Sequence, residues 1–122
     1  MGQIKCLDTY ILCEILQGNE KYFSYIKEDF VLTDVILAEF YWVILREFNE
    51  ATARYWLTKL KLNSFACSLE ILAKAMGNRK KLKRNLSFFD IVGYTYALEK
   101  NIPFVTGDKE FKSLPGVEFV PK

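Results

Sequence analysis

The chain has 122 residues, a length typical of one domain, and 51% of them are hydrophobic, which is enough to form a core. No segment combines low hydrophobicity with high net charge, so we expect order nearly throughout. The longest apolar stretch, 35–45, contains Glu39 and is shorter than the roughly 18 uncharged residues of a membrane span. With no targeting segment evident, the sequence predicts a single domain over 1–122 that has no membrane contact and stays in the cytoplasm.

Missing residue types restrict the chemistry further. The chain has no histidine, which excludes Ser-His-Asp and Cys-His triads, histidine acid–base catalysis and histidine-ligated zinc. Cys6, Cys13 and Cys67 form no C-x-x-C pair and are interpreted as buried reduced thiols. Catalysis must therefore rest on carboxylates, Lys, Tyr or a metal ion. The net charge is only +2, so a nucleic-acid partner can be inferred only from where the charge is placed.

Hydrophobic periodicity predicts strands that alternate with helices. In chain order we expect a strand over 4–7, a helix over 10–16, a helix over 19–26, a strand over 30–32, a helix from Asp34 to about Phe48 and a helix from Asn49 through Leu62. Next come a strand over 65–67, a helix from Ser68 into residues 79–84, a helix from Ser87 to Lys100, and strands over 102–106 and 117–120.

This alternation has two consequences. It implies an α/β fold with parallel crossovers, in which helices cover both faces of the sheet. The helix that begins at Asp34 is apolar on most of its faces, so we expect it to be packed inside the domain. In such sheets ligands bind beyond the carboxyl ends of the strands. Asp8 and Asp108 lie at or just after two of these predicted ends.

Four acidic residues are candidates for a site, although each has an alternative explanation. Asp8 can be a helix N-cap, and Asp108 can belong to the turn in Thr106-Gly107-Asp108. Asp90 fits a capping box with Ser87, although the box prefers Glu or Gln at that position. Glu39 lies in an apolar helix, where it requires either a Lys or Arg partner or an active-site cleft.

Together the four acids favour a metal site. Their positions after the first and fourth strands and in two helices can converge at one edge of the sheet. Carboxylates without histidine are a ligand set for a hard cation such as Mg²⁺ or Mn²⁺, which offsets their mutual repulsion. Such an ion lowers the pKa of water and stabilises charge on a phosphodiester. Thr106 places a hydroxyl near Asp108 and is a supporting candidate.

The segments around these acids resemble the four signature segments of PIN-domain ribonucleases. The segments are Cys-Leu-Asp8-Thr, Leu-Ala-Glu39-Phe, Leu-Ser-Phe-Phe-Asp90-Ile and Val-Thr106-Gly-Asp108-Lys-Glu-Phe111, and their order and spacing match along nearly the whole chain. The likeness is greatest to compact prokaryotic PIN toxins of the VapC type, which are Mg²⁺- or Mn²⁺-dependent endoribonucleases held inactive by a cognate antitoxin.

The resemblance implies a three-layer α/β/α domain whose parallel sheet of about five strands has the order 3-2-1-4-5, and commonly a homodimer. It implies that Asp8 and Asp90 provide most of the metal coordination, with Glu39 and Asp108 completing the site. All four acids are present, so inactivation is not indicated. The alternatives are a PIN protein that processes RNA without a toxin role, or a scaffold that binds RNA without cleaving it.

A basic stretch, residues 79–84, is a candidate contact for RNA phosphates. It contains five of the 17 positive residues, namely Arg79, Lys80, Lys81, Lys83 and Arg84. The alternative is a solvated helix end, where cations favour the negative pole of the helix dipole. Tyr10, Tyr41, Trp42 and Trp56 can stack on bases, but aromatic residues at helical spacing are more often core or dimer contacts.

Overall fold

The computed structural model describes residues 2–122 and contains the alternating elements expected from the sequence. Its strands are β1 (Lys5–Leu7), β2 (Phe30–Thr33), β3 (Ser64–Phe65), β4 (Phe104–Thr106) and β5 (Val117–Phe119). Its α-helices are α1 (Thr9–Leu16), α2 (Asp34–Glu47), α3 (Glu50–Leu60), α4 (Leu69–Leu82) and α5 (Phe88–Lys100). The short 3-10 helices are η1 (Glu20–Ile26), η2 (Lys61–Asn63) and η3 (Lys109–Phe111).

The five strands form one parallel sheet in the order β3-β2-β1-β4-β5, which confirms the predicted order. The first strand lies in the middle, where Cys6 pairs with Val31 of β2 on one side and with Phe104 of β4 on the other. The order changes direction at β1, so the residues after β1 and β4 lie at the position where parallel sheets usually bind ligands.

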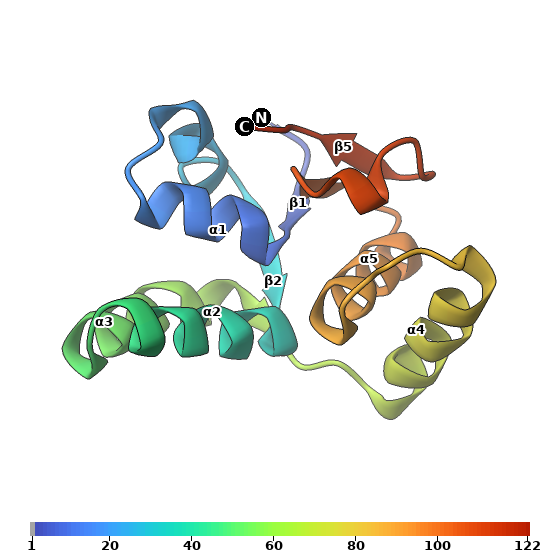
Figure 1. Cartoon of the computed structure of the whole chain (residues 1–122), viewed down its shortest axis with the longest axis horizontal. Helices are drawn as coiled ribbons and strands as arrows, with labels where there is room; N and C mark the ends of the chain where they lie inside the picture. The colour runs from blue at the N-terminus through green and yellow to red at the C-terminus, as the bar shows by residue number, and fades with distance from the viewer. Residues whose placement is uncertain (1) are drawn as a thin grey trace.

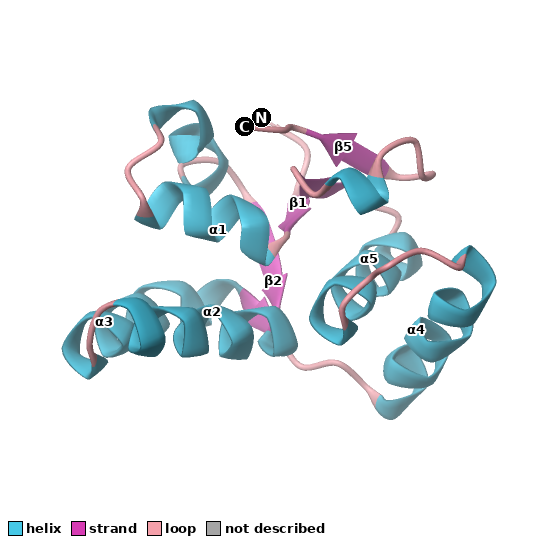
Figure 2. Cartoon of the chain, in the orientation of Figure 1, coloured by secondary structure: helices cyan, strands magenta, loops and turns pink. Residues whose placement is uncertain are grey.

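Helices cover the two sides of the sheet. Figure 1 shows α1, α2 and α3 on one side of β1 and β2, and α4 and α5 on the other. Figure 2 shows the short strands at the centre with the helices around them. Cys6, Leu7, Phe104 and Val105 are completely buried, as expected for strands covered on both faces. No helix within residues 2–122 has the length and apolar character needed to cross a membrane.

Gly93 allows α5 to lie directly against the sheet and α2. A Cβ atom at this position would lie 2.4 Å from Cδ1 of Ile36 and 2.9 Å from Cε1 of Phe104. Glycine is therefore the residue that permits this close approach. Because Asp90 lies three residues earlier in the same helix, this packing also determines how far the acid stands from β1.

The expected packing of α2 inside the domain is wrong. One face, with Ile36, Phe40 and Ile44, is buried, but the indole of Trp42 is 58% exposed and Phe48 just after the helix is exposed as well. A helix that is apolar all round carries no periodic signal of which face meets the core, and here the second apolar face is at the surface. The third strand is also shorter than expected and is shifted to Ser64–Phe65.

Candidate active site

Asp8 is the central acid of the site. It follows β1 directly, is 1% exposed, and is the N-cap of α1. Its Oδ1 accepts a hydrogen bond from the amide of Thr9 at 2.7 Å, and its Oδ2 accepts one from the hydroxyl of Thr106 at 2.6 Å. The N-cap alternative is therefore realised, but the carboxylate also faces groups from the end of β4.

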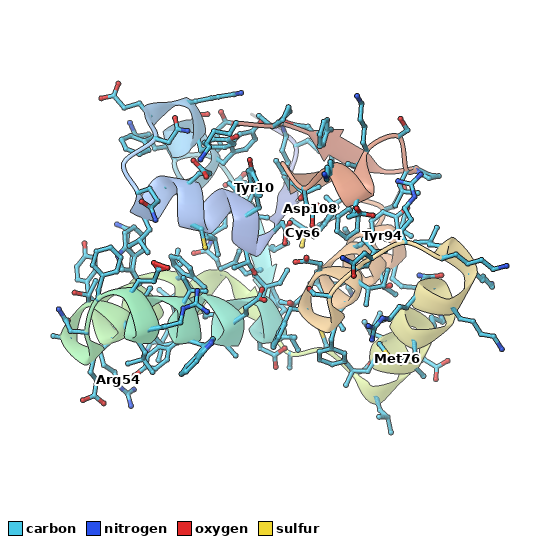
Figure 3. The ribbon with its side chains drawn as sticks, viewed as in Figure 1. Cys6, Tyr10, Arg54, Met76, Tyr94 and Asp108 are labelled. Atoms are coloured by element: carbon cyan, nitrogen blue, oxygen red, sulfur yellow. The ribbon has the colours of Figure 1, made fainter. Side chains whose placement is uncertain are left out.

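Thr106 joins the ends of β1 and β4. Its side chain is fully buried, and its hydroxyl, besides donating to Asp8, accepts a hydrogen bond from the amide of Asp108 at 3.0 Å. The Asp108 carboxylate caps η3 by accepting from the amide of Glu110 at 3.0 Å, so the turn alternative is also realised. Figure 3 shows Asp108 between α1 and α5, where β1 ends. Asp108 is thus connected to Asp8 through the Thr106 hydroxyl.

Asp90 lies in the first turn of α5, and its charge acts on Asp8. Its amide donates a hydrogen bond to the Ser87 hydroxyl at 3.1 Å, which is one half of the capping box. Among residues 2–122, the hydrogen bonds include none from the Ser87 amide back to the Asp90 carboxylate. The carboxylate therefore remains available to its neighbour Asp8.

Glu39 reaches the site from α2. It is half-buried, and its Oε1 accepts a hydrogen bond of 2.5 Å from the hydroxyl of Thr9. The ion pairs among residues 2–122 do not include Glu39, so the Lys or Arg partner of the alternative explanation is not found in that part of the chain. Thr9 was not a candidate from sequence. Its position directly after Asp8 was the only signal.

The electrostatics of the site raise the pKa of two of its acids, Asp8 and Glu39. Burial raises the pKa of Asp8 well above the ordinary value, and the nearby carboxylate of Asp90 raises it further. The bonds from Thr106 and Thr9 act in the opposite direction. Burial also raises the pKa of Glu39; its bond from Thr9 lowers it and the charge of Asp90 raises it. Asp8, Asp90 and Glu39 therefore repel one another when all are ionised.

The same repulsion reaches the Cys13 thiol on α1. Burial, followed by the charges of Glu39 and Asp8, raises its pKa to about 12. All three cysteines are free; Cys6 is buried, whereas Cys13 and Cys67 are only half-buried, which corrects the expectation that all are buried. At neutral pH these groups are protonated thiols and poor metal ligands.

The chemistry of the donor set fits a hard divalent cation. The candidates provide oxygen ligands only, and a positive ion between Asp8 and Asp90 would relieve the repulsion that raises the pKa of Asp8. Within residues 2–122, however, no three acidic or thiol side chains are already arranged so that they could hold one ion. The site thus contains a close acid pair. The Glu39 carboxylate is connected to it through Thr9, whereas Asp108 is connected through Thr106 only by its backbone amide, and its carboxylate caps η3.

The basic stretch is divided between two structural settings. Arg79, Lys80 and Lys81 occupy the last turn of α4, as the helix-end alternative expects, while Lys83 ends the helix in the left-handed conformation. The guanidinium of Arg84 donates hydrogen bonds of 2.9 Å to the carbonyls of Glu110 and Lys112. Arg84 therefore attaches the segment before α5 to η3, a role that sequence reasoning missed.

The aromatic candidates also have structural roles. Tyr10 packs on Gly107, where a Cβ atom would lie 2.2 Å from its ring, and its hydroxyl accepts from the amide of Lys122 at 3.2 Å. The Trp56 ring packs edge-to-face on Phe40 at 6.0 Å, and the guanidinium of Arg54 lies 5.7 Å from the Tyr41 ring. Of the four aromatic candidates, Trp42 is the one whose ring is mostly exposed.

The PIN domain family model matches residues 5–117, which is most of the chain and includes all four acids. The chain belongs to the PIN domain family. No curated protein sequence matches it significantly.

Solved structures share this PIN fold over almost their whole length. One is from a toxin-antitoxin complex of Klebsiella pneumoniae, with 19% identity, a TM-score of 0.77, and coverage of 93% of this chain and 95% of that one. Another is Mycobacterium tuberculosis VapC20, a toxin that cleaves the sarcin-ricin loop, with 15% identity, a TM-score of 0.76, and coverage of 96% and 99%. A third is FitAcB from Neisseria gonorrhoeae, with 18% identity, a TM-score of 0.70, and coverage of 96% and 97%.

Proposed function

We propose that this PIN domain is an endoribonuclease that depends on Mg²⁺ or Mn²⁺ and acts as the toxin of a type II toxin-antitoxin pair. The observation that carries the proposal is the pairing of the buried Asp8 with the partly exposed Asp90 in a PIN chain, at the switch point of the sheet. Two carboxylates this close, with no histidine in the chain, are more readily explained by a bound cation than by packing. The presence of toxin chains among the structures that share the fold supports the toxin role.

In this proposal the acids have different tasks. Asp8 and Asp90 hold the ion, and Glu39 and Asp108 complete the negative site around it. When bound, the ion supplies Lewis-acid stabilisation to a phosphodiester and lowers the pKa of the attacking water. Thr106 and Thr9 fix the Asp8 carboxylate through both of its oxygens, so that its orientation does not depend on the substrate.

The proposed partners are RNA, a cognate antitoxin and a second copy of the chain. Lys80, Lys81 and Lys83 are exposed and provide positive charge for RNA phosphates. Exposed aromatic residues such as Trp42 on α2 and Tyr55 on α3 suit a protein partner, because large apolar side chains at the surface are typical of interaction sites. One of the structures that share the fold comes from a toxin-antitoxin complex, that of Klebsiella pneumoniae, which supports an antitoxin as partner.

The direct test is an RNA cleavage assay with purified protein that has been freed of any bound partner. We expect cleavage with Mg²⁺ or Mn²⁺, none in excess EDTA, and none for Asp8→Asn, because an amide is a poorer cation ligand of nearly the same shape. Asp29→Asn is the matched control, since Asp29 is an exposed acid just before β2 and should retain full activity. Cleavage that persists in EDTA would contradict the metal mechanism.

Two further results separate the toxin from the alternatives. A toxin should arrest growth when expressed alone, Asp8→Asn should not, and the product of an adjacent short reading frame should bind the chain and restore growth. Cleavage without growth arrest would favour an RNA-processing nuclease. Binding of RNA without cleavage under any metal condition would favour the scaffold.

A further inference from the structure

Thr9 contacts two of the four acids, which come from different parts of the chain. It is the first residue of α1 and is 7% exposed. Its backbone amide donates a hydrogen bond to Oδ1 of Asp8, and its side-chain hydroxyl donates one of 2.5 Å to Oε1 of Glu39 on α2. A single residue thus connects the end of β1 with the middle of α2, thirty positions away.

The position of Thr9 in its helix leaves its hydroxyl free for Glu39. Inside a helix, a threonine hydroxyl commonly bonds to the carbonyl three or four residues earlier. For Thr9 these earlier residues belong to β1, so the helix offers no carbonyl of that kind. The β-branched side chain has few rotamers, and its donor is therefore held in one direction.

Glu39, in contrast, has a long side chain and little else to hold it. Among residues 2–122 it takes part in no ion pair, and its one side-chain hydrogen bond there is accepted from the hydroxyl of Thr9. This bond uses Oε1, and Oε2 accepts no hydrogen bond from residues 2–122. Without the Thr9 hydroxyl, the Glu39 side chain would sample several rotamers.

We infer that Thr9 is a positioning residue that keeps the Glu39 carboxylate beside the acid pair, so that its second oxygen can close onto a divalent cation when one binds there. The inference rests on the proposed function, because it assumes that these acids bind such a cation. Residues that orient a metal ligand by hydrogen bonding typically change metal affinity by about 10-fold to 100-fold when they are replaced. Thr9 should therefore affect cation affinity through Glu39 and not through the stability of the fold.

The test measures Mn²⁺ affinity by calorimetry, with no substrate present. Thr9→Val keeps the shape but removes the hydroxyl, and we expect about 10-fold weaker binding or more. Thr9→Ser restores the hydroxyl and should bind within a few-fold of the unmodified protein. Thr58→Val is the control, because Thr58 is exposed on α3 and should leave the affinity unchanged. If Thr9→Val does not fold, as judged by circular dichroism, Thr9→Ala is measured in its place.

A double-mutant cycle shows whether Thr9 acts through Glu39. In a Glu39→Gln background, Thr9→Val should cause little further loss, because the group that it positions is already altered. Equal losses in both backgrounds, or unchanged affinity in Thr9→Val alone, would overturn the inference while leaving the proposed function intact. Failure of the unmodified protein to bind Mn²⁺ at all would overturn the proposed function itself, and the Thr9 inference with it.

Discussion

The Thr106 hydroxyl donates a hydrogen bond of 2.6 Å to Oδ2 of Asp8, so a buried hydroxyl at the end of β4 supports the buried acid at the end of β1. The two residues are 98 positions apart in sequence, yet β1 and β4 are neighbours in the sheet. The same hydroxyl accepts a hydrogen bond from the amide of Asp108, so Thr106 contacts both the acid that follows β1 and the acid that follows β4.

Replacement of Thr106 by Val should therefore destabilise the domain. The change leaves Oδ2 of Asp8 buried without its donor, and such a loss costs about 1–3 kcal/mol in the free energy of unfolding. It should also raise the pKa of Asp8 further, since the Thr106 bond lowers it. Chemical denaturation measures the first effect. Thr106→Ser keeps the hydroxyl and should recover most of the loss; a Ser variant as unstable as the Val variant would assign the effect to packing.

The stability of the metal-free protein should depend on pH through Asp8. Burial and then Asp90 raise its pKa in the folded state above the ordinary value of 3.8, so the folded state binds the proton more tightly than the unfolded chain. This contribution to stability is fully present below pH 3.8 and is lost as the pH rises through the folded-state value. Asn does not titrate, so Asp8→Asn should abolish the part of the stability loss at rising pH that comes from Asp8.

Thermal melts in EDTA at several pH values compare the two proteins. The melting temperature of Asp8→Asn minus that of the unmodified protein should increase as the pH increases. Parallel pH profiles would mean that Asp8 has an ordinary pKa. Addition of Mn²⁺ at neutral pH should then raise the melting temperature of the unmodified protein far more than that of the variant, because an ion that binds only the folded state stabilises it.

Much of this site could be predicted from the sequence because its acids stand at element boundaries. Asp8, Asp90 and Asp108 each cap or begin a helix, and such positions are marked by local patterns. The strand order came from the family resemblance and was confirmed. Contacts between distant residues leave no local mark, so the roles of Thr9 and Arg84 could not be foreseen.

The basic stretch should affect RNA binding through its lysines. Replacing Lys80, Lys81 and Lys83 by Gln should weaken binding and reduce its salt dependence by about 0.7 log unit of slope for each lost phosphate contact to a single strand. The control replaces Lys27, Lys59 and Lys61, which are exposed on other elements and produce the same change in net charge. Identical affinities and slopes for the two triple variants would mean that the stretch does not contact RNA and is only a solvated helix end.

Arg84 should behave differently from these lysines. One guanidinium nitrogen, Nη1, donates to both carbonyls, those of Glu110 and Lys112, and a lysine is shorter and more flexible than the planar arginine head that places this nitrogen. Arg84→Lys should therefore lower the free energy of unfolding by about 1 kcal/mol or less, because the group is exposed, while the charge available to RNA is preserved. Reduced RNA binding with unchanged stability would instead assign Arg84 to the substrate surface.

Two glycines in neighbouring helices provide a matched test of how α5 positions Asp90. A methyl group at Gly93 would lie 2.4 Å from Cδ1 of Ile36, so Gly93→Ala should force α5 from the sheet and cost about 1–3 kcal/mol. Gly77 of α4 has no atom within 4 Å of the same methyl position, so Gly77→Ala should stabilise the domain by about 0.5–1 kcal/mol through helix propensity.

The two alanine variants should also differ in cation affinity. Displacement of α5 moves Asp90 relative to Asp8, so Gly93→Ala should weaken Mn²⁺ binding even at temperatures where the variant is fully folded, whereas Gly77→Ala should leave it unchanged. Calorimetry together with circular dichroism separates loss of affinity from loss of fold. Normal Mn²⁺ affinity in a folded Gly93→Ala variant would mean that the acid pair tolerates movement of α5, and that the close contact at Gly93 serves the core alone.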